Sequence, residues 1–166
     1  RGTTDTEFLY VLLLSLLEGD SDDHVQRGFE KLLKVICEAA RKLDLASLTK
    51  LKIALVSSDR IIGVNYGCGH EGETDVKGDW KRLRDEDLHL SMLLEPVYVL
   101  TGTNFQDYAN SYKVDACPEG EATSAIFASE PLTEDGDEWQ SINFGEIVFL
   151  ERKDGRIAKT VRKLDV

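Results

Sequence analysis

The segment IVFLERKDGRIAKTVR, residues 147–162, decides how the end of this chain must fold. Two strand-like runs, residues 147–152 and 157–162, lie on the two sides of Asp154 and Gly155. An Asp-Gly pair between two alternating runs is among the strongest short-range signals of a β-hairpin. The segment therefore predicts two antiparallel strands joined by a turn at residues 153–156.

A second hairpin is expected further back along the chain. Leu51, Ile53 and Leu55 recur at every second position, residues 57–60 supply a turn, and a return strand follows at 61–66. The remaining predictions, in chain order, are a glycine-rich acidic loop at 67–78, a helix at 80–94, a strand at 97–100, a long irregular connection at 101–122 and a strand at 124–129.

Two helices are expected before the first strand. Residues 4–7, Thr-Asp-Thr-Glu, have the capping-box form, in which a hydroxyl and a carboxylate satisfy amide groups of the first helical turn. The run 8–17 is apolar on nearly every face, so this helix is predicted to be buried and to end near Gly19. Residues 24–43 carry apolar side chains at helical spacing on one side, which predicts an amphipathic helix covering one face of a sheet.

The composition fits a single domain over residues 1–166. Apolar residues make up 42% of the chain, and the order of helices and hairpins indicates an α+β fold with mainly antiparallel sheets covered by helices. The 31 acidic and 20 basic residues give a net charge of −11, and the basic cluster Lys159, Arg162 and Lys163 is too small to form a binding stripe. Nucleic acid and membrane surfaces are therefore disfavoured as partners.

Three cysteines, Cys37, Cys68 and Cys117, are widely spaced and contain no Cys-x-x-Cys pair. This number and spacing argue against a disulfide framework and favour a reducing, cytoplasmic setting. Cys37 lies at an apolar helical position and is expected to pack in the core. The run 8–17 is about half as long as a bilayer requires, so no membrane span is expected.

Three elements of the sequence resemble class II glutamine amidotransferases. Gly2-Thr3-Thr4-Asp5-Thr6-Glu7, leading into an apolar helix, resembles the family's Ser/Thr-Asp-Ser/Thr-Glu element. Ala128-Ser129-Glu130-Pro131-Leu132 resembles its Ala-Ser-Glu element at a strand end. The family closes with a Gly-Glu strand before a final hairpin. The residues of this chain that resemble this pattern are Trp139, Ile142, Gly145-Glu146-Ile147-Val148 and Asp154-Gly155. The Ser-Glu-Pro-Leu form is most similar to the branch of predicted bacterial amidotransferases, the ergothioneine-pathway amidohydrolase and the fungal glutathione-degrading amidotransferase.

The resemblance implies an N-terminal-nucleophile hydrolase fold, an αββα sandwich of two mainly antiparallel sheets, of which this chain would be the C-terminal portion. The family releases ammonia from glutamine, or cleaves a γ-glutamyl amide, through a thioester on an N-terminal cysteine. The cysteine's own α-amino group is the base. No cofactor and no metal are expected.

The resemblance assigns roles to four residues of this chain. The family's aspartate in the Thr-Asp-Thr-Glu element binds the α-amino group of the glutamyl substrate, which makes Asp5, with Thr4 beside it, the expected substrate-binding pair. A helix N-terminus favours negative charge, so the carboxylate there suits a substrate ammonium. Support of the helix cap alone is the alternative role for Asp5. Ser129 and Glu130 are expected to position other groups.

The chain departs from the family at its start. Arg1 cannot be the nucleophile, and the family's cysteine, substrate-binding arginine and oxyanion-hole Asn-Gly element all precede the Thr-Asp-Thr-Glu motif. We therefore expect no catalytic residue in this chain, no glutaminase activity from it alone, and an upstream segment of the same protein as its partner. A partner subunit is implied by the resemblance only.

Three other hypotheses stay open. The chain is a non-catalytic binding or regulatory domain that keeps the amidotransferase scaffold. Thr3 is a nucleophile exposed by removal of the first two residues. A metal binds in the acidic loop, although the spacing there matches no standard zinc or EF-hand pattern; the candidate ligands are Cys68, His70, Glu71, Glu73 and Asp75.

Overall fold

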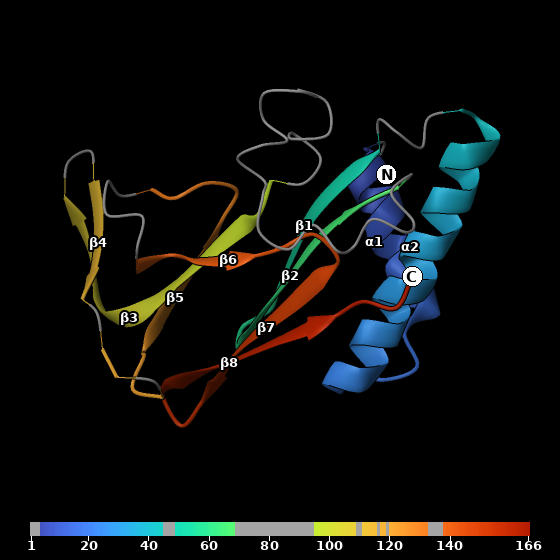
Figure 1. Cartoon of the computed structure of the whole chain (residues 1–166). Coiled ribbons are helices and arrows are strands. Elements are labelled where there is room, and N and C mark those ends of the chain that lie inside the picture. Colours follow the sequence, from blue (N-terminus) through green and yellow to red (C-terminus); the bar gives the residue numbers. More distant parts are fainter. Residues whose placement is uncertain are drawn as a thin grey trace, which may run out of the picture.

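The structure, a computed structural model, describes residues 4–44, 49–68, 95–108, 111–115, 117–118, 120–132 and 138–166. Over these residues the chain forms two helices and two antiparallel sheets, an α+β fold (Figure 1). The elements in chain order are α1 (Asp5–Leu16), α2 (Asp22–Lys42), β1 (Lys50–Val56), β2 (Arg60–Gly67), β3 (Val97–Tyr108), β4 (Ser111–Asp115), β5 (Ser124–Ala128), β6 (Gln140–Ile142), β7 (Glu146–Lys153) and β8 (Arg156–Lys163).

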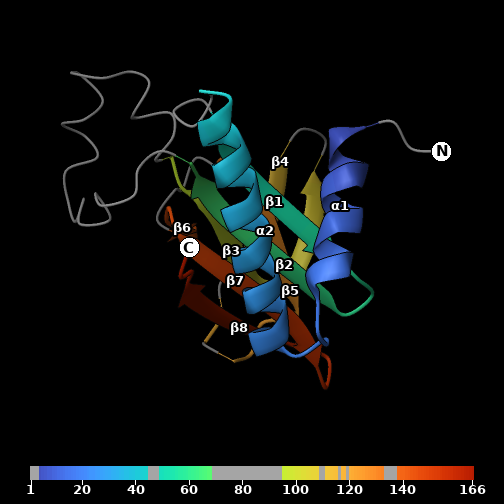
Figure 2. The ribbon, with the colours of Figure 1, turned by 90° about the vertical axis from the view of Figure 1, so that its right-hand side faces the viewer.

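The helices and sheets lie in three layers. The first sheet has the strand order β1-β2-β7-β8, and the second has the order β4-β3-β5 with β6 paired to β3. Both helices pack on one face of the first sheet, and the second sheet packs against its other face (Figure 1). Figure 2 looks onto the helical layer, where α2 crosses the first sheet and α1 lies beside it.

Strand β7 contributes to the cores on both sides of the first sheet. Ile147 and Phe149 belong to the core under the helices, whereas Val148 and Leu150 belong to the core between the sheets. Successive side chains of a strand point to opposite faces, so a strand covered on both sides is apolar at every position. The helix-side core also contains Val25, Phe29, Leu32, Leu33, Ile62 and Val64, and the core between the sheets contains Val97, Val99 and Ile142.

The two sheets approach each other closely at Gly63 of β2. A Cβ atom built on Gly63 would lie only 2.2 Å from Cε2 of Phe127, which belongs to β5 of the second sheet. Such a distance is a severe overlap, so the aromatic ring occupies the space that any larger residue would need. This glycine therefore fixes how tightly the two sheets pack.

Both predicted hairpins are confirmed. β1 pairs with β2 and β7 pairs with β8, and the turn residues Asp154 and Gly155 have φ angles of 51° and 78°. Positive φ at both positions is what a tight hairpin turn requires. The amphipathic helix predicted at 24–43 is α2, which starts slightly earlier because Ser21 provides the N-cap. The strand predicted at 124–129 is β5.

The prediction that the first helix is buried on nearly every face is wrong. Phe8 is 79% exposed and Val11 is 64% exposed, although Leu13 is buried. α1 lies beside α2 rather than between layers, so only its side toward α2 and the first sheet is covered; the residues that pack there include Leu9, Leu12 and Leu16. Among the described helices, none combines the length and apolarity that crossing a bilayer demands.

The irregular connection predicted at 101–122 is also wrong in large part. β3 continues through this region to Tyr108, and β4 pairs back onto it. Asn104 has a φ angle of 52°, and the register shifts between Thr103 and Gln106, so a bulge interrupts the alternation on which a sequence pattern depends. The three-residue strand β6 was not predicted. The helix predicted at 80–94 and most of the loop predicted at 67–78 lie outside the described residues.

A disulfide joins Cys37 of α2 to Cys68, which follows β2. The number and spacing of the cysteines, which argued against a disulfide framework, did not indicate this bond, because the two residues meet only when α2 packs on the first sheet. Cys37 lies in the core as expected, and Cys117 is free. The preference for a reducing, cytoplasmic setting rested on unpaired cysteines and loses that support.

Candidate functional site

The start of α1 carries the two residues predicted to bind substrate. Thr4 is the N-cap, and its Oγ1 accepts a hydrogen bond from the backbone N–H of Glu7 at 3.4 Å. The hydroxyl half of the predicted capping box is therefore present. Asp5 is the first helical residue and is exposed, so its carboxylate lies at the positive end of the helix dipole and is open to a cationic ligand.

Ser129 and Glu130 follow β5, next to the position where Ala128 pairs with Tyr98. Both side chains are exposed, and neither forms a hydrogen bond or ion pair within the described part of the chain. Their expected role in positioning other groups stays a prediction.

The two predicted pairs belong to different layers of the fold. Thr4 and Asp5 start a helix on one side of the first sheet, whereas Ser129 and Glu130 follow a strand of the second sheet on the other side (Figure 1). The first sheet separates the elements that carry them, so the described residues do not assemble the four side chains into one site.

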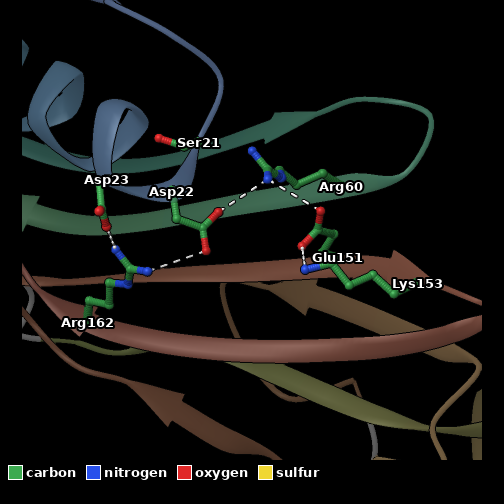
Figure 3. Close-up of a pocket in the computed structure, with 7 residues that line it drawn as sticks. All are labelled: Ser21, Asp22, Asp23, Arg60, Glu151, Lys153 and Arg162. Atoms are coloured by element: carbon green, nitrogen blue, oxygen red, sulfur yellow. Dashed lines mark hydrogen bonds and ion pairs between the residues drawn. The ribbon is translucent and has the colours of Figure 1, made fainter.

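An open depression of about 340 Å³ lies at the start of α2 (Figure 3). Four secondary-structure elements contribute charged side chains to it, and Ser21 lies at its rim. The charged residues are Asp22 and Asp23 of α2, Arg60 of β2, Glu151 and Lys153 of β7, and Arg162 of β8.

Asp22 is at the centre of the ion pairs in this depression. Its Oδ1 lies 3.2 Å from Nη2 of Arg60, and its Oδ2 lies 3.6 Å from Nη2 of Arg162. Each arginine also reaches a second carboxylate. Arg162 contacts Asp23 at 2.6 Å, and Arg60 contacts Glu151 at 3.5 Å. The two arginines thus connect the first turn of α2 to the strands beneath it.

These contacts shift three pKa values. The hydrogen bond from Arg162, and then its positive charge, lowers the pKa of Asp23. The hydrogen bond from Lys153, whose Nζ lies 2.6 Å from Oε2 of Glu151, lowers the pKa of Glu151, and the same bond raises the pKa of Lys153. All three groups therefore keep their charges over a wider pH range than they would without their partners.

The charges in the depression cancel, with three carboxylates against three cations. A neutral network leaves no excess charge to attract a charged ligand, so it joins elements rather than forming an anion or cation site. The start of a helix can be read from Ser21 and the two aspartates, but Arg162 lies 139 positions from Asp23, and only the fold brings them together.

Asn65 of β2 is the buried polar residue among those that the structure describes. Its Nδ2 donates to the carbonyl oxygens of Glu95 at 3.1 Å and Ile142 at 3.2 Å, whereas Oδ1 is buried without a partner. Asn65 therefore ties the first sheet to the beginning of β3 and the end of β6. A single asparagine in an apolar strand gave no signal of this role in the sequence.

The structure describes the cysteines and some of the candidate metal ligands. Cys37 and Cys68 are both used by the disulfide, which removes Cys68 as a metal ligand, and Cys117 is half-buried. Within the described residues, no group of three or more His, Cys, Asp or Glu side chains is placed to hold a metal ion. Thr3 and the other candidate ligands of the acidic loop, His70, Glu71, Glu73 and Asp75, lie outside those residues.

Three comparisons with known proteins bear on the identity of the chain. None of the family models, curated proteins or solved structures searched matches it. The side chains and their arrangement must therefore carry any functional proposal, since a fold alone does not specify an activity.

Proposed function

We propose that this chain is the C-terminal portion of a class II glutamine amidotransferase domain that acts on glutamine or a small γ-glutamyl compound. The order of the elements at 2–7, 128–132 and 145–155 supports the proposal. The helix–sheet–sheet layering, with antiparallel pairing of all the described strands, is compatible with the αββα sandwich of that family. A second helical layer has no counterpart among the described residues.

The position of Asp5 is the observation on which this proposal mainly rests. Its carboxylate is exposed at the first position of α1, and the cap at Thr4 fixes the backbone of that turn. A carboxylate held there can accept charge-assisted hydrogen bonds from the α-ammonium group of a glutamyl substrate. Thr4 contributes by positioning the helix start, and Asp5 contributes the charge.

The proposed reaction needs a nucleophile from an upstream segment of the same protein. A cysteine at the N-terminus of that segment would lose its thiol proton to its own α-amino group. The thiolate adds to the carboxamide carbon of glutamine, ammonia leaves as the thioester forms, and water then releases glutamate. Asp5 takes no part in the proton transfers. It holds the substrate ammonium and so orients the carboxamide toward the thiolate.

Steady-state glutamine hydrolysis by the natural protein with its upstream segment tests the role of Asp5. Asp5→Asn keeps the shape of the side chain and removes its charge. A hydrogen bond to a charged group contributes about 1.5–3 kcal/mol, so KM for glutamine should rise at least about tenfold while kcat changes little.

Glu7→Gln is the matched control for this measurement. Glu7 is the other acidic residue in the first turn of α1 and is also exposed, so the variant changes the net charge and the helix dipole environment in the same way. Both kinetic constants should stay at their wild-type values. An unchanged KM in Asp5→Asn, or an equal rise in both variants, contradicts specific substrate binding by Asp5.

A non-catalytic binding domain is the second candidate. The state of the described cysteines is compatible with it, because two are joined in a buried disulfide and the third, Cys117, is half-buried. Calorimetry separates the candidates. Glutamine binding that is lost in Asp5→Asn, in a natural protein that releases no ammonia, supports a binding domain and refutes the enzyme.

A further inference from the structure

Helix α2 is held on the first sheet unequally along its length. Its first turn is ion-paired to Arg60 of β2 and Arg162 of β8. The buried residues of its first half are Val25, Gly28, Phe29, Leu32 and Leu33. Residues 38–43, which follow Cys37, are called the end segment below. Among these described positions, Ala40 alone is buried. The start of the helix therefore has many contacts with the sheet, and the end segment has few buried ones.

The disulfide lies directly before the end segment. Cys37 belongs to α2, and Cys68 follows β2 and donates its backbone N–H to the carbonyl oxygen of Thr49, just before β1. The bond therefore joins the helix to the place where β1 begins and β2 ends. A single buried alanine removes little apolar area from water, and helix ends with few buried contacts open most readily. The covalent bond is thus the main anchor of the end segment.

We propose that the Cys37–Cys68 disulfide is a redox-sensitive device that holds the end segment on the first sheet, and that its reduction releases this segment while the rest of the fold persists. The first half of α2 keeps its apolar contacts and its ion pairs when the bond is reduced. The core between the two sheets contains neither cysteine. Reduction therefore opens one end of the helical layer and leaves the other contacts of the described chain in place.

A dithiol supplies the two electrons that this reduction needs. Its thiolate attacks one sulfur of the bond, which forms a mixed disulfide and releases the first cysteine as a thiolate. The second thiol of the reductant then displaces the other cysteine, so the reductant leaves as a disulfide and both cysteines take up protons as thiols. Cys37 and Cys68 are each 1% exposed, so the attack occurs only during a transient opening of the helix end.

Tyr66 of β2 reports whether the end segment covers the sheet. It is 8% exposed and lies in the same core as Cys37 and Ala40. Burial raises the pKa of the Tyr66 hydroxyl, and the positive charge of Arg41, which belongs to the end segment, opposes part of that rise. Release of the segment removes both effects. Because burial is the larger one, the pKa of Tyr66 should then fall toward its usual value.

Hydrogen exchange followed by mass spectrometry tests the proposal on the folded protein before and after reduction with dithiothreitol. In the oxidised protein, the amides of the end segment and of residues 28–33 should both be protected at least about 100-fold. After reduction, protection of the end segment should fall below about tenfold, whereas residues 28–33 should stay protected about 100-fold. The proposal is overturned if reduction leaves the protection of the end segment unchanged, or removes the protection of both segments together.

Two cysteine variants separate the bond from any other effect of the reductant. Cys37→Ala with Cys68→Ala cannot form the disulfide, so its end segment should exchange rapidly with or without dithiothreitol. Cys117→Ala keeps the disulfide and should respond as the wild type does, because Cys117 is a free cysteine. A folded double variant whose end segment stays protected contradicts the role assigned to the bond.

Spectrophotometric titration of tyrosine provides the second measurement. Adding Tyr66→Phe to the wild type and to the double cysteine variant isolates the Tyr66 hydroxyl by difference. Its pKa should lie above the usual value of about 10 in the wild type and should move toward that value in the double variant. The same pKa in both chains means that Tyr66 stays covered without the disulfide, which overturns the proposal. Neither experiment involves glutamine, so the outcome is independent of the proposed function.

Discussion

Removing the disulfide between Cys37 and Cys68 should lower thermal stability by an amount that follows from its position in the chain. The bond joins residues 31 positions apart. For a loop of that length, the loss of unfolded-state entropy, −2.1 − 1.5R ln n, corresponds to about 3.7 kcal/mol at 25 °C. In a chain of this size, 1 kcal/mol shifts Tm by about 2–4 °C, so Tm should fall by roughly 7–15 °C.

Thermal unfolding by circular dichroism, on protein refolded with or without reductant, gives the measurement. Three chains are compared: the wild type, Cys37→Ala with Cys68→Ala, and Cys117→Ala. In reductant, the Tm of the wild type and of Cys117→Ala should fall by the amount stated above, because only these two chains can form the disulfide. The double variant should be destabilised already and should not respond. The reasoning is refuted if the Tm of the wild type is the same with and without reductant, or if reductant lowers the Tm of the double variant equally.

Three further predictions concern the packing and the charges. Asn65→Asp should destabilise the protein by about 3–5 kcal/mol in urea unfolding, because it buries a carboxylate facing two carbonyl oxygens, whereas Asn65→Leu should cost about 1–3 kcal/mol; equal losses contradict the hydrogen bonds assigned to Nδ2. Gly63→Ala should cost about 1–3 kcal/mol because its methyl group overlaps the Phe127 ring, and adding Phe127→Leu should recover part of that loss; additive costs contradict a direct contact. In a carboxyl NMR titration, the pKa of Asp23 should lie below 3.8 and that of Glu151 below 4.5. The stability that the two carboxylates contribute is then complete above those pH values and is lost as pH falls through the lower native pKa values. Native pKa values at or above 3.8 and 4.5 contradict the two hydrogen bonds.

Regular local patterns were sufficient to predict several elements. The turn at Asp154-Gly155 needs only its own two residues and the strand-like runs beside it, so the sequence identifies the β7–β8 hairpin directly. The apolar residues of α2 recur at helical spacing, which places them together on one face of a helix. Both patterns are local, and no distant contact changes them.

The failures came where a distant contact or a local irregularity determines the structure. Apolar content suggested that α1 is buried, but content does not reveal which sides other elements cover. The αL residue Asn104 breaks the alternation of β3, so a strand resembled a loop. The disulfide at Cys37 and the ion pairs of Arg162 join residues far apart in the sequence, which no spacing rule connects.

The candidate site was predicted only as far as its local geometry reaches. The Thr-Asp-Thr-Glu pattern correctly indicated a helix start with Thr4 as its cap, and Asp5 is the first residue of that helix. Whether Ser129 and Glu130 support that site depends on how the layers meet, and the structure places them beyond the first sheet from α1. Motif order along a chain therefore does not establish proximity in space.

The central claim is tested most directly by intact-mass analysis of the natural full-length protein after incubation with a diazoketone analogue of glutamine. Such an analogue alkylates a thiolate that lies within reach of a bound glutamyl group. The proposal predicts one covalent adduct per chain, located by peptide mapping at an N-terminal cysteine upstream of this sequence and suppressed by excess glutamine and in Asp5→Asn. No adduct, or an adduct at Cys117, contradicts the assignment of this chain to a glutamine amidotransferase.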